Sequence, residues 1–384
     1  MKFSVLLPTR NRVDLLRYAV ESVRRQDFAD WEIVVSDNDS TDETQPYVRS
    51  LADSRIRYIR SPQFVPVTDN WNKALAASRG DYVVMLGDDD SLLPGYFSKL
   101  ARLTEQFANP ELAYVQAVQY AYPGVIPGNP NAFVQTGYCE FLEGRKEPFL
   151  LAPQQARSAV DKSMAMRLAF SYNMQHSLVS RRSIERLASH GPFFQSPYPD
   201  YYATNVLLLT SKSILVVPEP LVAIGISPKS FGHYYFNGRE AEGTAFLNNM
   251  GESSIPDTVR AVLLPGNALI TCWYAAMACI ERNFGGEYGV HADTGRYRQA
   301  QVLYTDRGAG RAVLRELWSR LTLAERLRYG SKRLLLAIGR RVLPRAAKEL
   351  WHRLAIFPPF DTGKREVPYR TILELFESYG KIHG

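Results

Sequence analysis

The sequence has 384 residues, of which 46% are hydrophobic and 22% are charged. This composition excludes a disordered chain and supports one main domain of about 200 residues or more with an appendage. Its formal net charge is +7, and its three cysteines are too few for a disulfide framework or a four-cysteine metal site. Cys272 and Cys279 are expected to be core thiols in a reducing compartment.

Membrane insertion is not indicated by the hydrophobic pattern. No run approaches the roughly 18 apolar residues of a membrane span, and the start of the chain is too short and strand-like for a signal peptide. The sequence therefore predicts a cytoplasmic protein in which any membrane contact is peripheral.

The first hundred residues alternate between strand-like and helical segments. Strands are expected at residues 2–7, 31–35, 55–59 and 81–86. Helices are expected at residues 12–25, 42–51 and 71–77 and again from Pro94. This alternation predicts a mostly parallel sheet covered on both faces.

Three polar loops follow the ends of the expected strands, at residues 8–12, 36–42 and 87–91. The carboxyl ends of parallel strands meet at one edge of a sheet, where ligands bind. The three loops are therefore expected to form one site.

Beyond residue 116 the alternation weakens. Residues 120–137 are rich in Pro, Gly and Asn and predict a loop or hairpin. A strand and helix (178–187), a helix (200–209) and a further strand (214–217) follow. Residues 226–240 form an aromatic and polar loop, and helices dominate from residue 258.

Three consecutive carboxylates, Asp88, Asp89 and Asp90, end the strand at residues 81–86. Adjacent carboxylates repel one another and resist burial, so they need a counter-charge. A hard divalent cation such as Mg²⁺ or Mn²⁺ fits. Solvated acids that cap the helix beginning at Pro94 are the structural alternative.

The segments FSVLLPTRNR, WEIVVSDNDSTDET and NWNKALAASRGDYVVMLGDDDSLLP stand in this order within residues 3–94. They resemble the family 2 glycosyltransferases of the bacterial surface-polysaccharide type, and a weaker resemblance continues to about residue 225. The resemblance implies an inverting transfer reaction and the GT-A fold. This fold is α/β and Rossmann-like, with a mostly parallel central sheet and flanking helices.

The resemblance implies a catalytic domain over residues 1–225, with nucleotide-sugar binding in about 1–115 and the acceptor side in about 116–225. A lid-like loop at 226–257 and a helical C-terminal region at 258–384 complete the expected organisation.

In the family the carboxylate motif begins with an Asp, and here Gly87 takes that place. The resemblance therefore implies that Asp88 contacts the donor and that Asp89 binds the metal, while Asp90 is structural. The loop after the first strand is expected to cradle the nucleotide through Pro8, Thr9, Arg10 and Arg12.

Two further residues are matched to the donor site by the resemblance. Asp37 corresponds to the acid that accepts a hydrogen bond from N3–H of uracil or thymine, although turn chemistry also explains an Asp in this loop. Asn72 corresponds to a helix residue that faces the donor pocket, and Trp71 beside it is expected in the core.

The family places an acidic general base ahead of a helix, and Asp200 stands at this point. A helix N-cap is the alternative role for Asp200, and His176 is the second candidate for the base. His233 is expected to close over the donor and add a metal or diphosphate contact, with Gly232 and Gly238 as hinges of the lid.

The basic charge belongs to one C-terminal segment. Residues 326–353 contain nine Lys or Arg and one Glu, which gives nine minus one, or +8. Short amphipathic helices in residues 321–354 fit an anionic membrane surface, and equally fit an appendage packed on the catalytic domain with a solvated basic face. No nucleic-acid-binding module accompanies the charge.

Together these features predict an inverting, metal-dependent hexosyl- or deoxyhexosyltransferase. It would move a sugar from a UDP- or dTDP-sugar to a hydroxyl of a saccharide or lipid-linked acceptor in cell-surface polysaccharide synthesis. A catalytically inactive GT-A scaffold is the alternative that Gly87 favours. A sugar-1-phosphate nucleotidyltransferase is disfavoured because the loop LLPTRNR lacks glycine.

Overall fold

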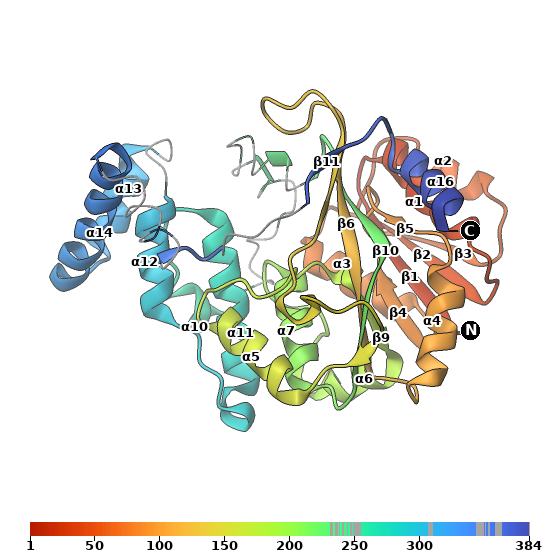
Figure 1. The fold of residues 1–384 in the computed structure, drawn as a ribbon, viewed down its shortest axis with the longest axis horizontal. Helices are drawn as coiled ribbons and strands as arrows, with labels where there is room; N and C mark the ends of the chain where they lie inside the picture. Colours follow the sequence, from red (N-terminus) through yellow and green to blue (C-terminus); the bar gives the residue numbers. More distant parts are fainter. Residues whose placement is uncertain are drawn as a thin grey trace.

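The structure, a computed structural model, describes residues 1–230, 255–305, 310–342 and 363–383, with single residues and short stretches between these ranges. Its centre is one sheet in which eight strands follow the order β11-β7-β6-β9-β4-β1-β2-β3 and β10 pairs with β5, β6 and β8 (Figure 1). The strands are β1 Phe3–Thr9, β2 Trp31–Asp37, β3 Ile56–Arg60, β4 Tyr82–Met85, β5 Ser91–Leu92, β6 Leu112–Ala121, β7 Phe133–Thr136, β8 Phe149–Leu150, β9 Ser177–Ser180, β10 Ile214–Ile226 and β11 Arg365–Glu366.

The sheet is parallel in its first part and mixed in its second. Strands β3, β2, β1 and β4 are parallel neighbours, as the alternation of strands and helices predicted. Strand β9 is antiparallel to both β4 and β6, and β7 returns antiparallel to β6 as the second arm of the expected hairpin. The predicted α/β fold is confirmed, with more antiparallel pairing beyond β4 than the sequence indicated.

Helices cover both faces of the sheet and form an arm beyond it. Those of seven residues or more are α1 Val13–Arg24, α2 Thr44–Ser50, α3 Val67–Ala77, α4 Tyr96–Gln106, α5 Pro153–Met164, α6 Arg181–Leu187, α7 Pro199–Thr210, α11 Ala268–Tyr288, α12 Thr294–Tyr304, α13 Arg311–Ser319, α14 Leu323–Val342 and α16 Ile372–His383. The short helices are α10 Asp257–Arg260 and the 3₁₀ turns Glu140–Leu142, Met174–His176 and Ala188–His190.

Two cores lie on opposite faces of the strands. In β1, Leu6 belongs to one core while Val5 and Leu7 belong to the other, because successive side chains on a strand point to opposite faces. This two-sided burial explains why β1 and β2 are continuous apolar runs.

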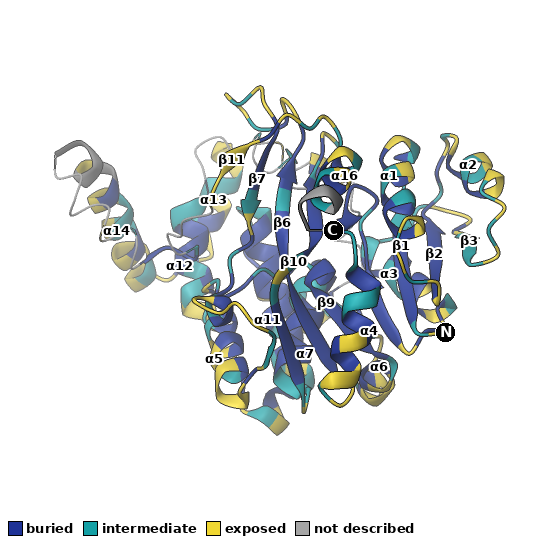
Figure 2. Cartoon of the chain, turned by 45° about the vertical axis from the view of Figure 1, so that its right-hand side comes forward, coloured by how far each residue is buried: buried dark blue, intermediate teal, exposed yellow. Residues whose placement is uncertain are grey.

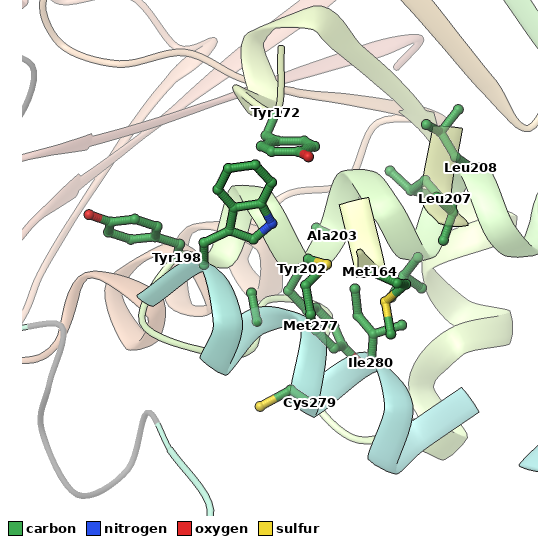
Figure 3. Close-up of a cluster of buried hydrophobic side chains, with 14 of the residues drawn as sticks. Met164, Tyr172, Tyr198, Tyr202, Ala203, Leu207, Leu208, Met277, Cys279 and Ile280 are labelled. Carbon is green, nitrogen blue, oxygen red and sulfur yellow. The ribbon is translucent and has the colours of Figure 1, made fainter. Parts of the chain in front are cut away.

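The arm of helices α10 to α14 extends from α7, against which α11 packs. Figure 3 shows Tyr202 of α7 beside Met277 of α11, and Leu207 and Ile280 belong to the same buried core. The expected core thiols, Cys272 and Cys279, are buried within α11.

The end of the chain returns to the sheet. Strand β11 pairs with β7, and α16 packs on α1 at the far side from the arm (Figure 1). The sequence assigned all of residues 258–384 to a helical region, because a two-residue strand carries no periodic signal. Within the described part of the chain, no helix has the length and apolar character needed to cross a membrane.

Candidate active site

A cavity of about 180 Å³ lies at the carboxyl ends of β1 and β4. Its wall includes six residues that the sequence assigned to donor or metal binding: Pro8, Thr9, Arg10, Arg12, Asp88 and Asp89. The expectation that the first and third polar loops meet at one edge of the sheet is therefore confirmed.

Asp88 is held by two residues of the loop after β1. Thr9 Oγ1 donates to Asp88 Oδ2 at 2.7 Å, and Arg12 Nη1 donates to Oδ1 at 2.7 Å. The Arg12 and Asp88 side chains are 10% and 4% exposed, so this is a buried ion pair. Burial alone would lower the pKa of Arg12, but the charges of Asp88 and Asp89 outweigh it and the pKa is raised.

Asp89 stands beside this pair with a weaker counter-charge. Ser227 Oγ donates to its Oδ2 at 2.7 Å, whereas Arg12 Nη1 lies 3.8 Å from Oδ1, beyond hydrogen-bonding distance. Burial raises the pKa of Asp89; the charge of Arg12 opposes this rise and that of Asp88 adds to it.

Asp90 has the structural role that the sequence predicted. Its carboxylate accepts hydrogen bonds from the Gly225 N–H at 2.8 Å, the Gly87 N–H at 2.8 Å and Gln175 Nε2 at 2.6 Å. Burial, with the charge of Asp89, raises the pKa of Asp90 to about 7.

The position of Asp90 also explains Gly87. A Cβ at Gly87 would lie 2.5 Å from Asp90 Oδ2, so a side chain there would displace the Asp90 carboxylate. Glycine at position 87 thus leaves room for the Asp90 carboxylate, while Asp88 and Asp89 line the cavity.

The residues present fit a divalent cation. Of the three buried carboxylates at this strand end, Asp88 and Asp89 share one buried guanidinium, and the pKa of Asp89 is raised by burial and by the charge of Asp88. No cluster of three or more His, Cys, Asp or Glu suited to a metal occurs among the described residues. A cation here would therefore take Asp89 as its protein ligand and would need further oxygen ligands from a bound substrate or water.

Part of the cavity wall is aromatic. The guanidinium of Arg10 stacks 3.8 Å above the ring of Phe64, and both residues line the cavity with Trp71. The side-chain amide of Asn38 bonds the backbone of Val65 in both directions, at 2.8 and 3.0 Å, which fixes the loop that carries Phe64. A flat ring bound here would contact the guanidinium of Arg10 and the aromatic side chains.

Two predicted donor residues do not line this cavity. Asp37 is fully buried, and its oxygens accept hydrogen bonds from the Ser40 N–H at 2.8 Å and the Tyr58 hydroxyl at 2.5 Å. Asn72 instead pairs through its amide with the backbone of Phe194, at 2.8 and 3.1 Å.

Neighbours of these two residues take their places in the wall. Asn38 stands there beside Asp37, and Asn70 and Trp71 stand there in place of Asn72. The sequence had assigned Trp71 to the core. The one-residue offset arises because helical periodicity alone does not fix which side of α3 faces the strand ends.

Asp200 lies in the first turn of α7 and does not line the cavity itself. The segment before α7 contacts α3, because Thr68 Oγ1 donates to the Ser196 carbonyl at 2.7 Å and Trp71 meets Phe194 edge-on at 5.2 Å. Asp200 therefore begins a helix next to the cavity wall. Burial raises the pKa of the Asp200 carboxyl to about 7.

The two candidate histidines lie elsewhere. His176 is fully buried, stacks on Tyr114 and contacts the Val115 carbonyl at 2.8 Å through Nδ1; burial lowers its pKa to about 4. His233 Nδ1 lies 3.1 Å from the Val125 carbonyl, and His233 does not line the cavity. Gly232 and Gly238, the expected hinges, lie outside the described residues.

Besides Asn38, Phe64 and Asn70 of the cavity wall, three residues that surround the carboxylates were missed in the sequence. Gln175 and Ser227 hold Asp90 and Asp89, and Gly225 lets β10 pass against the backbone of Asp89. They stand more than 80 residues from the carboxylates along the chain, and no local pattern marks them. The end of β10 at Ile226 was the one available signal for Ser227.

The resemblance noted in the sequence is confirmed by comparison with known proteins. Residues 4–158 match the family model Glycosyl transferase family 2. A GalNAc(5)-diNAcBac-PP-undecaprenol beta-1,3-glucosyltransferase of Campylobacter jejuni is 41% identical over 117 residues, 30% of this chain and 37% of the relative. The putative colanic acid biosynthesis glycosyl transferase WcaA of Escherichia coli is 31% identical over 136 residues, 34% of this chain and 49% of the relative.

A third relative is the UDP-Glc:alpha-D-GlcNAc-diphosphoundecaprenol beta-1,3-glucosyltransferase WfgD of Escherichia coli, 31% identical over 87 residues, 23% of this chain. The matches span 37%, 49% and 34% of the three relatives. Among solved structures, S. aureus TarS 1-349 in complex with UDP-GlcNAc superposes with a TM-score of 0.50 at 16% identity, covering 86% of this chain and 92% of that one. This likeness supports the expected GT-A fold.

Proposed function

We propose that the protein is an inverting glycosyltransferase, because residues 4–158 match the family model Glycosyl transferase family 2. It would move a sugar from a UDP- or dTDP-sugar to a hydroxyl group of a saccharide or lipid-linked acceptor. The observation that carries this proposal is the pair of buried carboxylates, Asp88 and Asp89, at the strand-end cavity.

Several residues of the cavity would take part in donor binding. Arg10 and Phe64 would provide a stacking surface for the base, and the hydrogen bonds from Arg12 and Thr9 orient Asp88. Asp89 would hold Mg²⁺ or Mn²⁺. When bound, the cation supplies Lewis-acid stabilisation of the departing diphosphate. Reading of the base by Asp37 would require Tyr58 to release Oδ2 of that carboxylate.

Asp200 is our candidate for the general base. A general base works best when its pKa lies near the working pH, and burial raises the pKa of Asp200 to about 7. The deprotonated carboxylate would accept the proton of the acceptor hydroxyl as that oxygen attacks the anomeric carbon. His176 is a poorer candidate because it is enclosed by the core.

The names of the relatives narrow the choice of donor and acceptor to test. Two of them name β-1,3-glucosyl transfer to diphosphoundecaprenol-linked acceptors, and one names UDP-Glc. UDP-glucose is therefore the first donor to test, and a saccharide on a lipid diphosphate is the first acceptor. With such an acceptor the reaction would take place at the inner face of the cytoplasmic membrane.

Calorimetric titration of UDP, dTDP and GDP, each with Mn²⁺ and again with EDTA, tests the donor site. We expect UDP or dTDP to bind in the presence of Mn²⁺, and EDTA or Asp89→Asn to weaken binding by about tenfold or more. Asp81→Asn is the matched control, because Asp81 is exposed just before the opposite end of the same strand, β4.

Each alternative result has a distinct meaning. Binding that is unchanged by EDTA and by Asp89→Asn would contradict the metal role and leave the nucleotide site. GDP preference would overturn the part given to Asp37. Absence of binding by all three nucleotides would support an inactive scaffold.

A further inference from the structure

Exposed large apolar side chains are concentrated on one helix of the arm. Among the described residues, eight large hydrophobic side chains are exposed, and five of them belong to α14: Leu323, Leu327, Leu334, Leu335 and Ile338. Their exposed fractions run from 51% to 73%. Scattered single apolar side chains are ordinary on a protein surface, whereas a cluster on one element marks an interaction site.

Helix α14 has two apolar sides. Tyr329 and Leu336 are buried on the side that packs against α12. At about 100° per residue, Leu323, Leu327, Leu334 and Ile338 share an arc of about 60° that points roughly away from Tyr329 and Leu336. We call these four residues the outer stripe. Figure 1 shows α14 at the end of the arm, away from the sheet.

The sequence of α14 is strongly basic. It contains six Lys or Arg (positions 326, 328, 332, 333, 340 and 341) and one acidic residue, Glu325, so six minus one gives +5. Glu325 is already paired with Arg298 of α12 at 2.6 Å. Arg326 and Arg328 are exposed on the same two turns as Leu327.

Lys332 and Arg333 attach α14 to α12 and the residue that follows it. Lys332 donates to Gln299 at 2.5 Å, and Arg333 donates to the carbonyls of Val302 and Thr305 at 3.0 and 3.2 Å. These bonds fix α14 on α12 with the outer stripe turned outward. The outer stripe therefore belongs to a helix that is held in place by its packing on α12.

We propose that the outer stripe of α14 docks the protein on an anionic lipid surface. An amphipathic helix binds such a surface by burying its apolar side at the headgroup boundary while its Lys and Arg side chains attract acidic lipids. A second copy of this chain fits less well, because two helices of charge +5 would meet face to face.

This docking goes beyond the transfer reaction and is compatible with it. Helix α14 packs on α12, α12 on α11, and α11 on α7, the helix that begins at Pro199 and carries Asp200. A lipid surface bound by α14 would therefore lie at a fixed distance and orientation from Asp200, the candidate base. Lipid binding needs neither donor nor turnover, so its failure and a failure of the proposed activity are separately observable.

Co-sedimentation with vesicles tests the proposal on the full chain. The probe is a vesicle of equal parts phosphatidylglycerol and phosphatidylcholine, compared with pure phosphatidylcholine, at low and at raised salt. The test variant is Leu327→Glu with Leu334→Glu. The matched control is Leu150→Glu with Val262→Glu, which makes the same charge change at two exposed apolar residues outside α14.

We expect the wild type to bind the acidic vesicles and to release them as salt rises. The stripe variant should lose binding by roughly tenfold or more, because two apolar contacts become like-charged with the lipid. The control variant should bind like the wild type, and all three proteins should show the same thermal unfolding by circular dichroism.

Three results would overturn the proposal. The wild type could fail to bind acidic vesicles, or the stripe and control variants could bind them equally. Sedimentation velocity could instead show a wild-type dimer that the stripe variant dissociates, which would assign the outer stripe to a second copy.

Discussion

The strand-end cavity and the helical arm both concentrate charge, and they do so in opposite ways. At the cavity, Asp88, Asp89, Asp90 and Arg12 are nearly enclosed, and each is bonded to a neighbour. On α14, six basic residues stand on a helix with exposed apolar side chains. Figure 2 shows the contrast as dark strands at the centre and lighter patches on α14.

The difference teaches where substitutions should matter. A buried charge depends on each of its partners, since losing one leaves an uncompensated group in a poorly solvated place. An exposed charge is solvated by water and is screened by salt, so its loss costs little stability. We therefore expect large effects near the cavity and small ones on the arm.

The largest effect is expected for Asp200→Asn. The amide has the size of the carboxyl group but cannot act as a base, so transfer should fall by roughly 10² to 10⁴-fold. In the wild type, activity should rise with pH with a midpoint near 7, where the half-buried Asp200 carboxyl, whose pKa is raised, loses its proton. A pH–rate profile of kcat/KM measures this, and a profile without that limb would contradict the assignment.

The same variant should be more stable than the wild type above pH 7. A raised folded pKa means that stability falls as pH rises from the ordinary value of 3.8 to about 7, and stays reduced above it. Removing the charge should recover about 1–3 kcal/mol. Asp161→Asn, on the exposed side of α5, is the control and should change neither the transfer activity nor the stability.

A second prediction concerns how closely β10 approaches the carboxylates. A Cβ at Gly225 would collide with the backbone carbonyl of Asp89. Gly225→Ala should therefore destabilise the protein by about 2 kcal/mol or more and reduce donor binding as well. Denaturant unfolding and nucleotide titration measure the two effects.

The matched control is Gly286→Ala on α11, where an added Cβ would meet nothing within 4 Å. There alanine should stabilise the helix by about 0.5–1 kcal/mol, because glycine loses more conformational freedom on folding. If the two substitutions had similar effects, the crowding at the cavity would be less than we infer.

The fold could be predicted from the sequence where elements are periodic and continuous. Strands β1, β2 and β4 are buried on both faces and have clear ends, whereas β3 is only partly buried; each of the four predicted strands overlaps an observed one. Strand β10 continues through Pro218 and Pro220 with shifts of register, where the sequence placed an end at residue 217. The prolines disrupt local pairing without ending the strand.

The site could be predicted where its residues are adjacent along the chain. Asp88 and Asp89 follow a strand directly, and their loop partner Arg12 stands in the first segment of the resemblance. Phe64 lies in a loop without a motif, and Gln175 and Ser227 reach the carboxylates only through folding. Such partners are set by tertiary packing, which a linear pattern does not encode.

The smallest effect is expected on the arm, for Glu325→Gln. Arg298 binds both oxygens of Glu325, at 2.6 and 2.9 Å, and lowers its pKa to about 2. This pairing stabilises the fold above the ordinary pKa of 4.5 and is lost as pH falls toward 2. The variant should lose about 1 kcal/mol at pH 7 and little near pH 2, as measured by denaturant unfolding. Glu316→Gln, whose carboxylate pairs with Arg320 on the exposed side of α13, should change stability less at either pH. A loss at Glu325 as large as that at Gly225 would mean that the arm is as tightly coupled as the cavity, against the contrast drawn between them.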